Sequence, residues 1–533
     1  MNINSEQSAS LNPSSFILHP CHIAVPVCAR RVAELHDAMS RAAQVADFVE
    51  LRLDCLDDVE LDAAMRAATE LLHSVTGPLI LTLRPAEQGG RRVIDVVARL
   101  AFWLKFFSSE PPGNIFADIE HDLLPLLQER AGAADLNIDW SRVICSQHDF
   151  TGVPANLEQL YEEMAAGPAR ILKIAVQANA ITDCLAVFRL LERARHEGRE
   201  LIAVAMGEAG ITTRILGPSR GTSLTFGALD ETQATAPGQL AAADLRELYR
   251  LDSISERTAI TGLLGWPVAH SLSPHMHNAA FAARKLDAVY LPLAVNGARE
   301  FMRRMVHPRT REMRWDLRGL SVTAPHKSAI MESLDSIDEA AREIGAVNTV
   351  VVEGDELCGY NTDAAAALVP LENLIDLNGA RVAVIGAGGA ARAMLWGLRE
   401  RGAKTTIFAR RTATAQEIAE QFAAPVQTLE GARFDEFDLV VNTTPLGTRG
   451  QLETETPATA AQLCGARIAY DLVYNPSETR FMREAHEAGC ESVLNGLPML
   501  VAQAATQFQL WTGEEAPLEV MRAAAERRIA EKR

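Results

Sequence analysis

The chain has 533 residues and a formal net charge of −18 at pH 7. So negative a chain disfavours binding to nucleic acid or to an anionic membrane surface, and any anionic substrate must be attracted by local basic residues. The length predicts three or more domains, and no apolar run is long enough to read as a membrane span.

The N-terminal segment and the cysteines favour a cytoplasmic location. Residues 1–18 are polar and poor in basic side chains, unlike a secretory signal or a transit peptide, and we expect a disordered leader there. The eight cysteines are scattered and form no CxxC pair, so we expect neither a zinc site nor a disulfide scaffold. Several lie in apolar runs, where a free cysteine acts as a small hydrophobic side chain.

Residues 19–250 alternate short apolar runs with segments of helical periodicity. The expected strands are His22–Val27, Phe48–Asp54, Leu79–Arg84, Asn114–Glu120, Arg142–Asp149, Ile171–Val176, Leu201–Gly207 and Ser223–Ala228. Eight such β-α units predict an α/β fold, a closed (β/α)8 TIM barrel, with an open doubly wound sheet as the alternative. Either fold places its chemistry at the carboxyl ends of the strands.

Charged side chains within these expected strands indicate a site inside the barrel. The two-residue period of a strand puts Glu50, Arg52 and Asp54 on one face. Helices cover the outside of a barrel, so these charges face inward, where each needs a partner. The alternative is a purely structural ion-pair network. Neighbouring strands add further charged or titratable residues, namely Arg84, Asp118, Glu120 and His148.

Lys173 is the most informative residue of this half, because it lies within the apolar run Ile171–Val176. Burial of an isolated lysine disfavours its charged form. A neutral amine can attack a carbonyl group and form a Schiff base. His148, one strand away, can move protons near neutral pH. Lysine, histidine and anion-binding arginines together indicate imine chemistry on a keto acid.

Five runs of this half resemble type I 3-dehydroquinate dehydratase, in the order of that family. The runs are Glu50–Asp54, Ser146–Phe150, Leu172–Ala175, Met206–Arg214 and Ala236–Gln239. The resemblance implies that Lys173 forms an imine with the ketone of 3-dehydroquinate and that His148 is the general acid and base. It implies that Arg214 binds the carboxylate. The other implied substrate-binding or ordering residues are Glu50, Arg52, Arg84, Thr235 and Gln239.

Two positions depart from the family pattern. Gln88 stands where the family usually has glutamate, and Thr235 stands where serine is common. A neutral amide cannot take a proton, so an acid-base role at Gln88 is lost, whereas threonine keeps the hydroxyl. We expect activity to survive, and the effect of Gln88 on the rate stays open.

A polar junction at 251–257 precedes a second set of elements. The expected strand Ala259–Gly265 leads through a turn into a helix from Pro274 to Lys285. In the turn, Ser271 and Ser273 can bind one small anion, with helix capping as the alternative. The nearby histidines lack clustered carboxylates or cysteines, so we expect no metal site. These histidines are His270, His275 and His277.

Three further runs place polar side chains at the ends of apolar segments, namely Ser321–Lys327, Gly345–Thr349 and Gly359–Asp363. Residues 257–525 resemble shikimate dehydrogenase. The resemblance implies that Ser271 and Ser273 bind the substrate carboxylate and that Lys327 and Asp363 are the catalytic pair. Residues implied to hold the ring hydroxyls are Thr323, Asn348, Asp363 and Gln503. Ser321 and Ala365, which replace a frequent Asn and Gly, lie outside the catalytic pair.

A glycine turn in the expected Rossmann domain, residues 363–497, predicts a dinucleotide site. Strand Arg381–Ile385 precedes the turn and helix Ala390–Gly402 follows it. The turn lets the backbone approach a pyrophosphate at the amino end of the helix, while an ordinary glycine-rich turn is the alternative. The implied cofactor-binding residues here are Gly386, Ala387, Gly388, Gly389 and Ala390.

The next strand, Thr405–Ala409, predicts which dinucleotide binds. It ends at Arg410 and Arg411, which attract a 2'-phosphate, whereas an NAD site usually carries an acidic residue. The cofactor is therefore predicted to be NADP. By the resemblance, Thr444, Gly496 and Met499 line the cofactor and Tyr474 the substrate. Helices in 498–533 are expected to complete the 257–362 substrate domain.

The two halves together predict a bifunctional enzyme that dehydrates 3-dehydroquinate and reduces the product, 3-dehydroshikimate, to shikimate with NADPH. A non-enzymatic sensor with similar domains is one alternative, disfavoured because the lysines, His148 and Asp363 are present. An NAD-dependent, quinate-oxidising second half is another, disfavoured by the serine pair and the double arginine. The oligomeric state and substrate channelling stay open.

Overall fold

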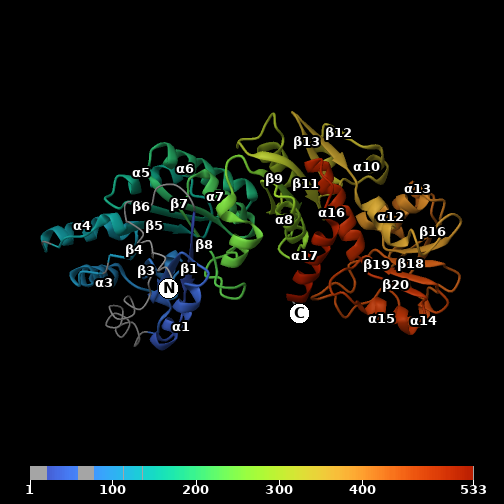
Figure 1. The fold of residues 1–533 in the computed structure, drawn as a ribbon, viewed down its shortest axis with the longest axis horizontal. Coiled ribbons are helices and arrows are strands. Elements are labelled where there is room, and N and C mark those ends of the chain that lie inside the picture. Colours follow the sequence, from blue (N-terminus) through green and yellow to red (C-terminus); the bar gives the residue numbers. More distant parts are fainter. Residues whose placement is uncertain (1–20, 58–76, 112, 135, 532–533) are drawn as a thin grey trace, which may run out of the picture. The chain divides into compact units, whose positions relative to one another are not determined.

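The computed structural model describes residues 21–57, 77–111, 113–134 and 136–531, which fall into two units, 1–257 and 258–533 (Figure 1). The expected leader at 1–18 lies outside the described residues. Among the described residues no helix is both long and apolar enough to cross a membrane.

The first unit is built on one sheet of eight strands. They are β1 (His22–Val27), β2 (Phe48–Arg52), β3 (Leu79–Thr82), β4 (Ile115–Glu120), β5 (Val143–Asp149), β6 (Ile171–Gln177), β7 (Glu200–Met206) and β8 (Leu224–Phe226). Their order is β7-β6-β5-β4-β3-β2-β1-β8, and the paired strands are parallel. This ring order confirms the predicted barrel, although the described hydrogen bonds do not join β7 to β8.

Helices follow the strands and lie around them (Figure 1). Those described are α1 (Val32–Ala42), α3 (Val96–Ser108), α4 (Leu124–Ala133), α5 (Leu157–Ala165), α6 (Cys184–His196) and α7 (Ile211–Arg220). Because each helix covers the outer face of the strands, the inward-facing residues form layers inside the barrel.

One apolar layer closes the inside of the barrel and receives a residue from every strand. Its members are Ala24, Phe48, Ile80, Phe116, Ile144, Ile171, Ile202, Leu224 and Phe226. The next inward-facing position of a strand comes two residues later. That position is occupied in β2 to β6 by Glu50, Thr82, Asp118, Ser146 and Lys173. Strand alternation thus places a polar layer directly on top of an apolar one, towards the carboxyl ends.

Cys28 and Cys55 form a disulfide, so the expectation of no disulfide is wrong at this pair. They are 27 residues apart in sequence, but they follow β1 and β2, which are neighbours in the sheet. Their Cα atoms are therefore only 5.4 Å apart. Spacing along the chain did not reveal this proximity, because it results from strand pairing. The other six cysteines are free.

The first sheet of the second unit mixes parallel and antiparallel strands. They are β9 (Ala259–Gly265), β10 (Ala288–Ala294), β11 (Asp316–Val322), β12 (Ser336–Ile337), β13 (Thr349–Glu353) and β14 (Glu356–Tyr360), in the order β10-β9-β11-β13-β14-β12. β13 runs antiparallel to β11 and β14. Its first residue, Thr349, therefore pairs with Ser321 near the end of β11 and with Tyr360 at the end of β14. Three segments distant in sequence meet at this edge.

Helices of this sheet include two from the end of the chain. They are α8 (Ser273–Ala283), α9 (Ala298–Phe301), α10 (Glu339–Ile344), α11 (Asp363–Leu368), α16 (Leu497–Thr512) and α17 (Leu518–Glu531). Phe281 of α8 shares a buried cluster with Phe508 of α16 and Met521 of α17. The last helices thus pack against helix α8 and strands of the first sheet.

The second sheet of this unit is fully parallel and confirms the Rossmann prediction. Its strands are β15 (Arg381–Ile385), β16 (Lys404–Ala409), β17 (Val426–Thr428), β18 (Leu439–Asn442), β19 (Ile468–Asp471) and β20 (Ser492–Leu494), ordered β17-β16-β15-β18-β19-β20. β17 and β20, of three residues each, were not predicted. Helices α12 (Gly389–Glu400) and α13 (Thr412–Phe422) lie on one face, and α14 (Ala460–Leu463) and α15 (Arg480–Glu487) on the other (Figure 1).

Candidate active sites

Lys173 lies in the polar layer of the barrel and is 5% exposed. Its ammonium group donates to Asp118 Oδ2 at 2.8 Å, lies 3.6 Å from Glu50 Oε1, and sits 3.9 Å from the centre of the Phe226 ring. The sequence-based view of an isolated lysine is therefore wrong, because β2 and β4 bring carboxylates to the same layer. These groups can stabilise a cationic imine at the same position.

Arg84 holds the carboxylates around Lys173. Its guanidinium donates to Asp118 at 2.6 Å, to Glu120 at 2.9 Å and to Ser146 Oγ at 2.6 Å. Although burial opposes the shift, Arg84 and Lys173 hold the pKa of Asp118 well below its usual range. Since these contacts engage Arg84 within the protein, its geometry suits ordering the site better than binding a substrate hydroxyl.

His148 lies one layer above Lys173, two residues beyond Ser146 in β5. Burial of the ring, together with the charges of Arg84 and Lys173, lowers the pKa of His148 well below its ordinary value. Within the part of the chain that the structure describes, its buried Nδ1 atom has no hydrogen-bond partner. The imidazole is therefore neutral near pH 7 and able to accept a proton.

Gln88 lies beside His148 and contacts its backbone. The His148 backbone N–H donates to Gln88 Oε1 at 3.2 Å, and Gln88 is 8% exposed. The amide oxygen accepts this hydrogen bond as a carboxylate oxygen would, but it brings no negative charge to the imidazole. The departure from the family pattern thus keeps one positioning contact at this residue.

Arg214 is a buried cation without a carboxylate partner among the described residues. Its guanidinium donates to the carbonyls of Phe226 at 3.3 Å and Pro237 at 3.4 Å, and burial lowers the pKa of Arg214 to about 10. A buried, unpaired cation is costly unless an anion joins it. Arg214 therefore favours an anionic ligand group such as a carboxylate.

The remaining predicted residues of the barrel site divide between strand and loop. The Arg52 guanidinium donates to both oxygens of Asp54, at 2.9 and 2.8 Å, so it is engaged within the protein. Thr235 and Gln239 lie in the loop after β8, where the Thr235 backbone N–H donates to Gln239 Oε1 at 2.8 Å. This loop includes Pro237, whose carbonyl accepts from Arg214.

Lys327 and Asp363 meet at the edge of the mixed sheet. The Lys327 ammonium donates to Asp363 Oδ2 at 2.5 Å. Lys327 follows β11 and Asp363 follows β14, so the antiparallel strand β13 brings their carboxyl ends together. The Asp363 backbone N–H donates to Asn361 Oδ1 at 3.1 Å, which fixes the start of α11. The family resemblance implied this pair, and the sheet topology explains why the two side chains meet.

Asn348 and Thr323 lie at the same edge. Asn348 Oδ1 accepts from the Thr362 backbone N–H and from Thr349 Oγ1, both at 2.8 Å. A side chain at Gly265 would lie 2.2 Å from Thr323 Cγ2, so the glycine lets Thr323 pack against the turn after β9. These contacts hold both polar residues beside the Lys327 turn.

The sequence analysis missed a buried hydrogen-bond network behind this edge. Tyr290 Oη donates to Ser321 Oγ at 2.7 Å, and Ser321 Oγ donates to Gln507 Oε1 at 2.8 Å. Gln507 Nε2 donates to Thr349 Oγ1 at 3.0 Å. Gln507 lies one helical turn after the predicted Gln503, and this spacing on α16 was the signal that could have found it.

The serine pair lies at the amino end of α8. The Ser273 backbone N–H donates to Ser271 Oγ at 3.2 Å, a local turn contact before the helix, whose N-cap residue is Leu272. Ser273 is 7% exposed, and its hydroxyl lies beside that of Tyr290. This turn contact uses the Ser273 backbone and not its hydroxyl, so binding of a small anion stays a prediction for Ser273.

The glycine turn follows β15, which pairs with β16 on one side and with β18 on the other, and this reversal of strand order is the switch point at which such sheets bind dinucleotides. Gly386 has a φ of 120°, and a side chain there would lie 2.5 Å from Thr443 Oγ1, so glycine is required. A Cβ atom at Gly389 would lie 3.8 Å from Lys327 Cδ. The turn therefore adjoins the Lys327–Asp363 pair. Ala387 and Ala390, the other predicted residues of the turn, flank these glycines.

The other predicted cofactor residues follow neighbouring strands. Arg410 and Arg411 are exposed directly after β16, which pairs with β15. The Thr444 hydroxyl, after β18, donates to Asn442 Oδ1 at 2.7 Å. Together with Gly496 and Met499 at the start of α16, these residues can line one side of a dinucleotide. Tyr474, which was predicted to contact the substrate, follows β19.

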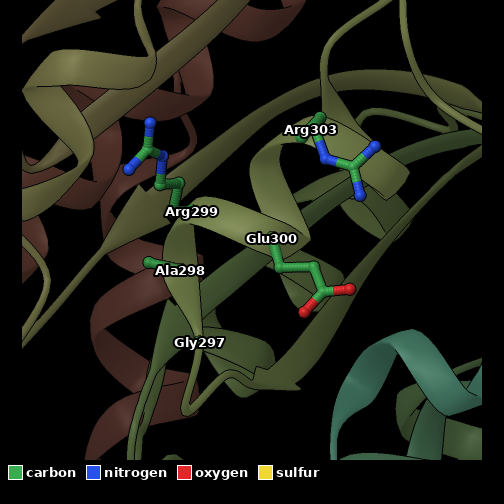
Figure 2. Close-up of a pocket in the computed structure, with 5 residues that line it drawn as sticks. All are labelled: Gly297, Ala298, Arg299, Glu300 and Arg303. Carbon is green, nitrogen blue, oxygen red and sulfur yellow. The ribbon is translucent and has the colours of Figure 1, made fainter.

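A pocket of about 460 Å³ lies beside the short helix α9, away from these residues (Figure 2). Its lining residues are Gly297, Ala298, Arg299, Glu300 and Arg303. None of them belongs to the predicted sites, and we assign the pocket no function. Among the described residues, no group of histidine, cysteine and acidic side chains could hold a metal ion.

Comparison with protein families gives three matches. Residues 23–256 match type I 3-dehydroquinase. Residues 263–350 match the shikimate dehydrogenase substrate binding domain, and residues 496–526 match the shikimate 5'-dehydrogenase C-terminal domain. The first match covers the barrel, and the other two cover the mixed sheet and helix α16.

Individual proteins give the same result over longer stretches. The chain is similar to the bifunctional 3-dehydroquinate dehydratase/shikimate dehydrogenase of Arabidopsis thaliana, named chloroplastic, with 32% identity over 95% of this chain and 84% of the relative. It is similar to the NADP(+) shikimate dehydrogenase of Carboxydothermus hydrogenoformans, with 38% identity over 51% of this chain and 98% of the relative. A crystal structure of a shikimate dehydrogenase in complex with NADP+ is 36% identical, covers 52% of this chain and 97% of its own, and superposes with a TM-score of 0.48.

Proposed function

We propose, from the premise that this chain belongs to the bifunctional 3-dehydroquinate dehydratase/shikimate dehydrogenases, that each of its two units carries one active site. The chain is a lyase that dehydrates 3-dehydroquinate and an NADP-dependent oxidoreductase that reduces 3-dehydroshikimate to shikimate. The observation that carries the two-site assignment is the pair of separate lysine centres. Lys173 lies in the polar layer of the barrel, and Lys327 pairs with Asp363 beside the glycine turn.

The domain assignment follows the three sheets, one for each domain. We place the dehydratase in residues 19–250 and the substrate domain of the dehydrogenase in 257–362 with 498–533. The cofactor domain is then 363–497. The packing of α16 and α17 on α8 supports the discontinuous substrate domain.

In the dehydratase, Lys173 attacks the ketone of 3-dehydroquinate. The nitrogen lone pair forms a C–N bond, the carbonyl oxygen leaves as water after taking one proton from the amine nitrogen and one from solvent, and a cationic imine remains. Asp118 and Glu50 stabilise that cation at the position where they now hold the ammonium group. Arg214, which has no carboxylate partner among the described residues, binds the substrate carboxylate.

His148 moves the protons of this reaction. Its neutral imidazole takes the proton from the carbon next to the imine, and the imine accepts the electron pair of that C–H bond. The electron pair then returns as the hydroxyl group leaves, and His148 gives its proton to form water. Hydrolysis of the imine frees Lys173 and releases 3-dehydroshikimate.

In the dehydrogenase, Lys327 gives a proton to the carbonyl oxygen of 3-dehydroshikimate. Bound NADPH supplies the hydride to the carbonyl carbon, which becomes the alcohol carbon of shikimate. Asp363, 2.5 Å from the ammonium nitrogen, orients Lys327. The serine pair Ser271 and Ser273 binds the carboxylate, while Thr323, Asn348 and Gln503 hold the ring hydroxyls.

The position after β16 is expected to determine the preference for NADP. Replacing Arg410 with serine removes a cation that pairs with the 2'-phosphate, and KM for NADPH should rise about tenfold to a hundredfold. KM for NADH should change little. The measurement is kcat/KM with each cofactor. Arg381→Ser, at the opposite end of the neighbouring strand, is the control; a wild-type preference for NADH would overturn this assignment.

The bifunctional assignment is tested by supplying 3-dehydroquinate and NADPH together to the purified full chain. Shikimate should accumulate, with one NADPH oxidised for each 3-dehydroquinate consumed. A control with NADPH omitted should stop at 3-dehydroshikimate. Accumulation of 3-dehydroshikimate in the presence of NADPH would contradict the dehydrogenase half, and unchanged 3-dehydroquinate would contradict the dehydratase half.

The substrates are small molecules, and we infer a cytoplasmic location from the composition of the chain. The Arabidopsis relative is named chloroplastic, so this location is a property to be tested for this chain. We also propose that the chain does not bind nucleic acid, because of its net charge of −18.

A further inference from the structure

A row of alternating charges connects Lys173 to the outer rim of the barrel. From the rim inward, the N···O distances between successive members are 2.7, 3.0, 2.9, 2.6 and 2.8 Å. The members of this charged row are Asp122, Arg99, Glu120, Arg84, Asp118 and Lys173. All except Asp122 are buried.

Arg99 is the member of the charged row that lies on an α-helix. It lies in the first turns of α3, whose start is capped by the Asp95 side chain accepting from the Ala98 backbone N–H. A helix that follows a strand begins at the carboxyl end of the barrel, where the polar layers lie. Arg99 can therefore reach inward, and it donates to Glu120 Oε2 at 3.0 Å.

Glu120 is shared between two arginines. Arg99 donates to one carboxylate oxygen and Arg84 to the other. Burial raises the pKa of Glu120, and both arginines oppose that shift, so each of them favours the charged form of the group. If Arg99 were absent, Arg84 alone would have to balance Glu120, although it also balances Asp118.

The charges of the buried cluster sum to zero. Three carboxylates, Glu50, Asp118 and Glu120, face three cations, Lys173, Arg84 and Arg99. Losing Arg99 leaves one negative charge in excess in a region of low dielectric, where unbalanced charges interact strongly.

We propose that Arg99 is a positioning residue of the dehydratase. By balancing Glu120, it keeps Arg84 on Asp118, and it thereby limits how firmly Asp118 holds the ammonium form of Lys173. This inference rests on the proposed function, because it matters only if the neutral amine of Lys173 is the nucleophile.

The groups around Lys173 determine the direction of the effect. Glu50 faces it from β2, Asp118 from β4 and the Phe226 ring from β8. Two further charged or titratable groups lie nearby: Arg84, which follows β3, and His148, which lies in β5. Without Arg99, Glu120 draws Arg84 away from Asp118. Asp118 then holds the ammonium form up to a higher pH, and less amine is available near neutrality.

The test is the rate at which borohydride traps 3-dehydroquinate on the full chain, measured against pH. Arg99→Gln is expected to raise the pH of half-maximal trapping by about one unit, so that trapping at neutral pH falls about tenfold. Arg142→Gln is the matched control. Arg142 also pairs with an aspartate, Asp139, at 2.7 Å, but it precedes β5 at the other end of the barrel. We expect no shift for it.

Two further variants separate the charge effect from loss of packing. Glu120→Gln removes the carboxylate that competes for Arg84, and the pH of half-maximal trapping should fall. The double variant Arg99→Gln/Glu120→Gln should return close to the wild-type value. If Arg99 served only in packing, the two single variants would not shift the pH of half-maximal trapping in opposite directions, and the double variant would not recover the wild-type value. Shifts in the same direction, or effects that add in the double variant, would therefore overturn the inference.

Folding of the first unit in each variant is followed by thermal unfolding of the full chain compared with wild type, and dehydrogenase activity checks the second unit alone. If Arg99→Gln does not fold, the Glu120→Gln variant provides the test. An unchanged pH of half-maximal trapping in Glu120→Gln would then overturn the proposal. If the wild type itself is not trapped, the imine assignment to Lys173 fails instead. An unshifted Arg99→Gln in a protein whose wild type is trapped contradicts the role of Arg99 alone.

Discussion

Replacing Lys173 with alanine is expected to lower the dehydration of 3-dehydroquinate by at least about 10³-fold. The first 257 residues contain two lysines, Lys105 and Lys173, and Lys105 lies on the exposed side of α3. No second amine of this unit can therefore replace the nucleophile. The rise of the enone absorbance of 3-dehydroshikimate measures the rate. Lys105→Ala is the control and should behave as wild type.

A second substitution separates the nucleophile from the charge. Lys173→Ala leaves Asp118 and Glu50 facing each other without their cation, and removal of one partner from a buried pair is destabilising. Lys173→Arg keeps a positive charge there, but a guanidinium is not deprotonated in proteins and cannot form the imine. It should be as inactive as the alanine variant and more stable to thermal unfolding.

Borohydride gives the direct observation. Wild-type protein incubated with 3-dehydroquinate and borohydride should gain one substrate-derived adduct on the peptide that contains Lys173. Both Lys173 variants should gain none, and both should still reduce 3-dehydroshikimate with NADPH. An adduct at Lys105, or full dehydratase activity in Lys173→Arg, would contradict the imine assignment.

The layers of the barrel could be predicted from the sequence because each strand carries its own pattern. An apolar residue followed two positions later by a polar one, as in Phe48–Glu50 or Ile171–Lys173, places the polar side chain inside and nearer the carboxyl end. The glycine turn was predictable for the same reason, since strand, turn and helix are contiguous.

Contacts between residues of different strands could not be predicted in this way. Lys173 was expected to be isolated, but Asp118, 55 residues earlier, lies in the same layer, and its carboxylate accepts a hydrogen bond from Lys173. The Cys28–Cys55 disulfide was missed for the same reason. In both cases partner choice depends on strand order and register, which single-strand periodicity does not contain.

The role of Arg99 lies further still from the sequence pattern. A buried arginine on a barrel helix has the same local signature as an exposed one, and α3 carries apolar residues on several sides. Only the position of Glu120 across from it shows that the side chain turns inward. Helix residues near the carboxyl ends of strands are therefore candidates that strand periodicity overlooks.

Replacing Lys327 with alanine is expected to lower kcat of the dehydrogenase by about 10²- to 10⁴-fold, the usual contribution of a positioned acid or base. The KM for NADPH should change little, because the proposed cofactor contacts lie on the glycine turn and after β16. Dehydratase activity should be unchanged, since Lys173 lies in the other unit. Loss of both activities would contradict two independent sites.

Asp363→Asn tests whether the aspartate orients the lysine. Asparagine can accept a hydrogen bond from the Lys327 ammonium but supplies no negative charge at 2.5 Å. The ammonium group is then held less firmly, and kcat for reduction should fall about tenfold with little change in the KM for NADPH. A kcat that Asp363→Asn leaves unchanged would mean that Asp363 does not orient Lys327.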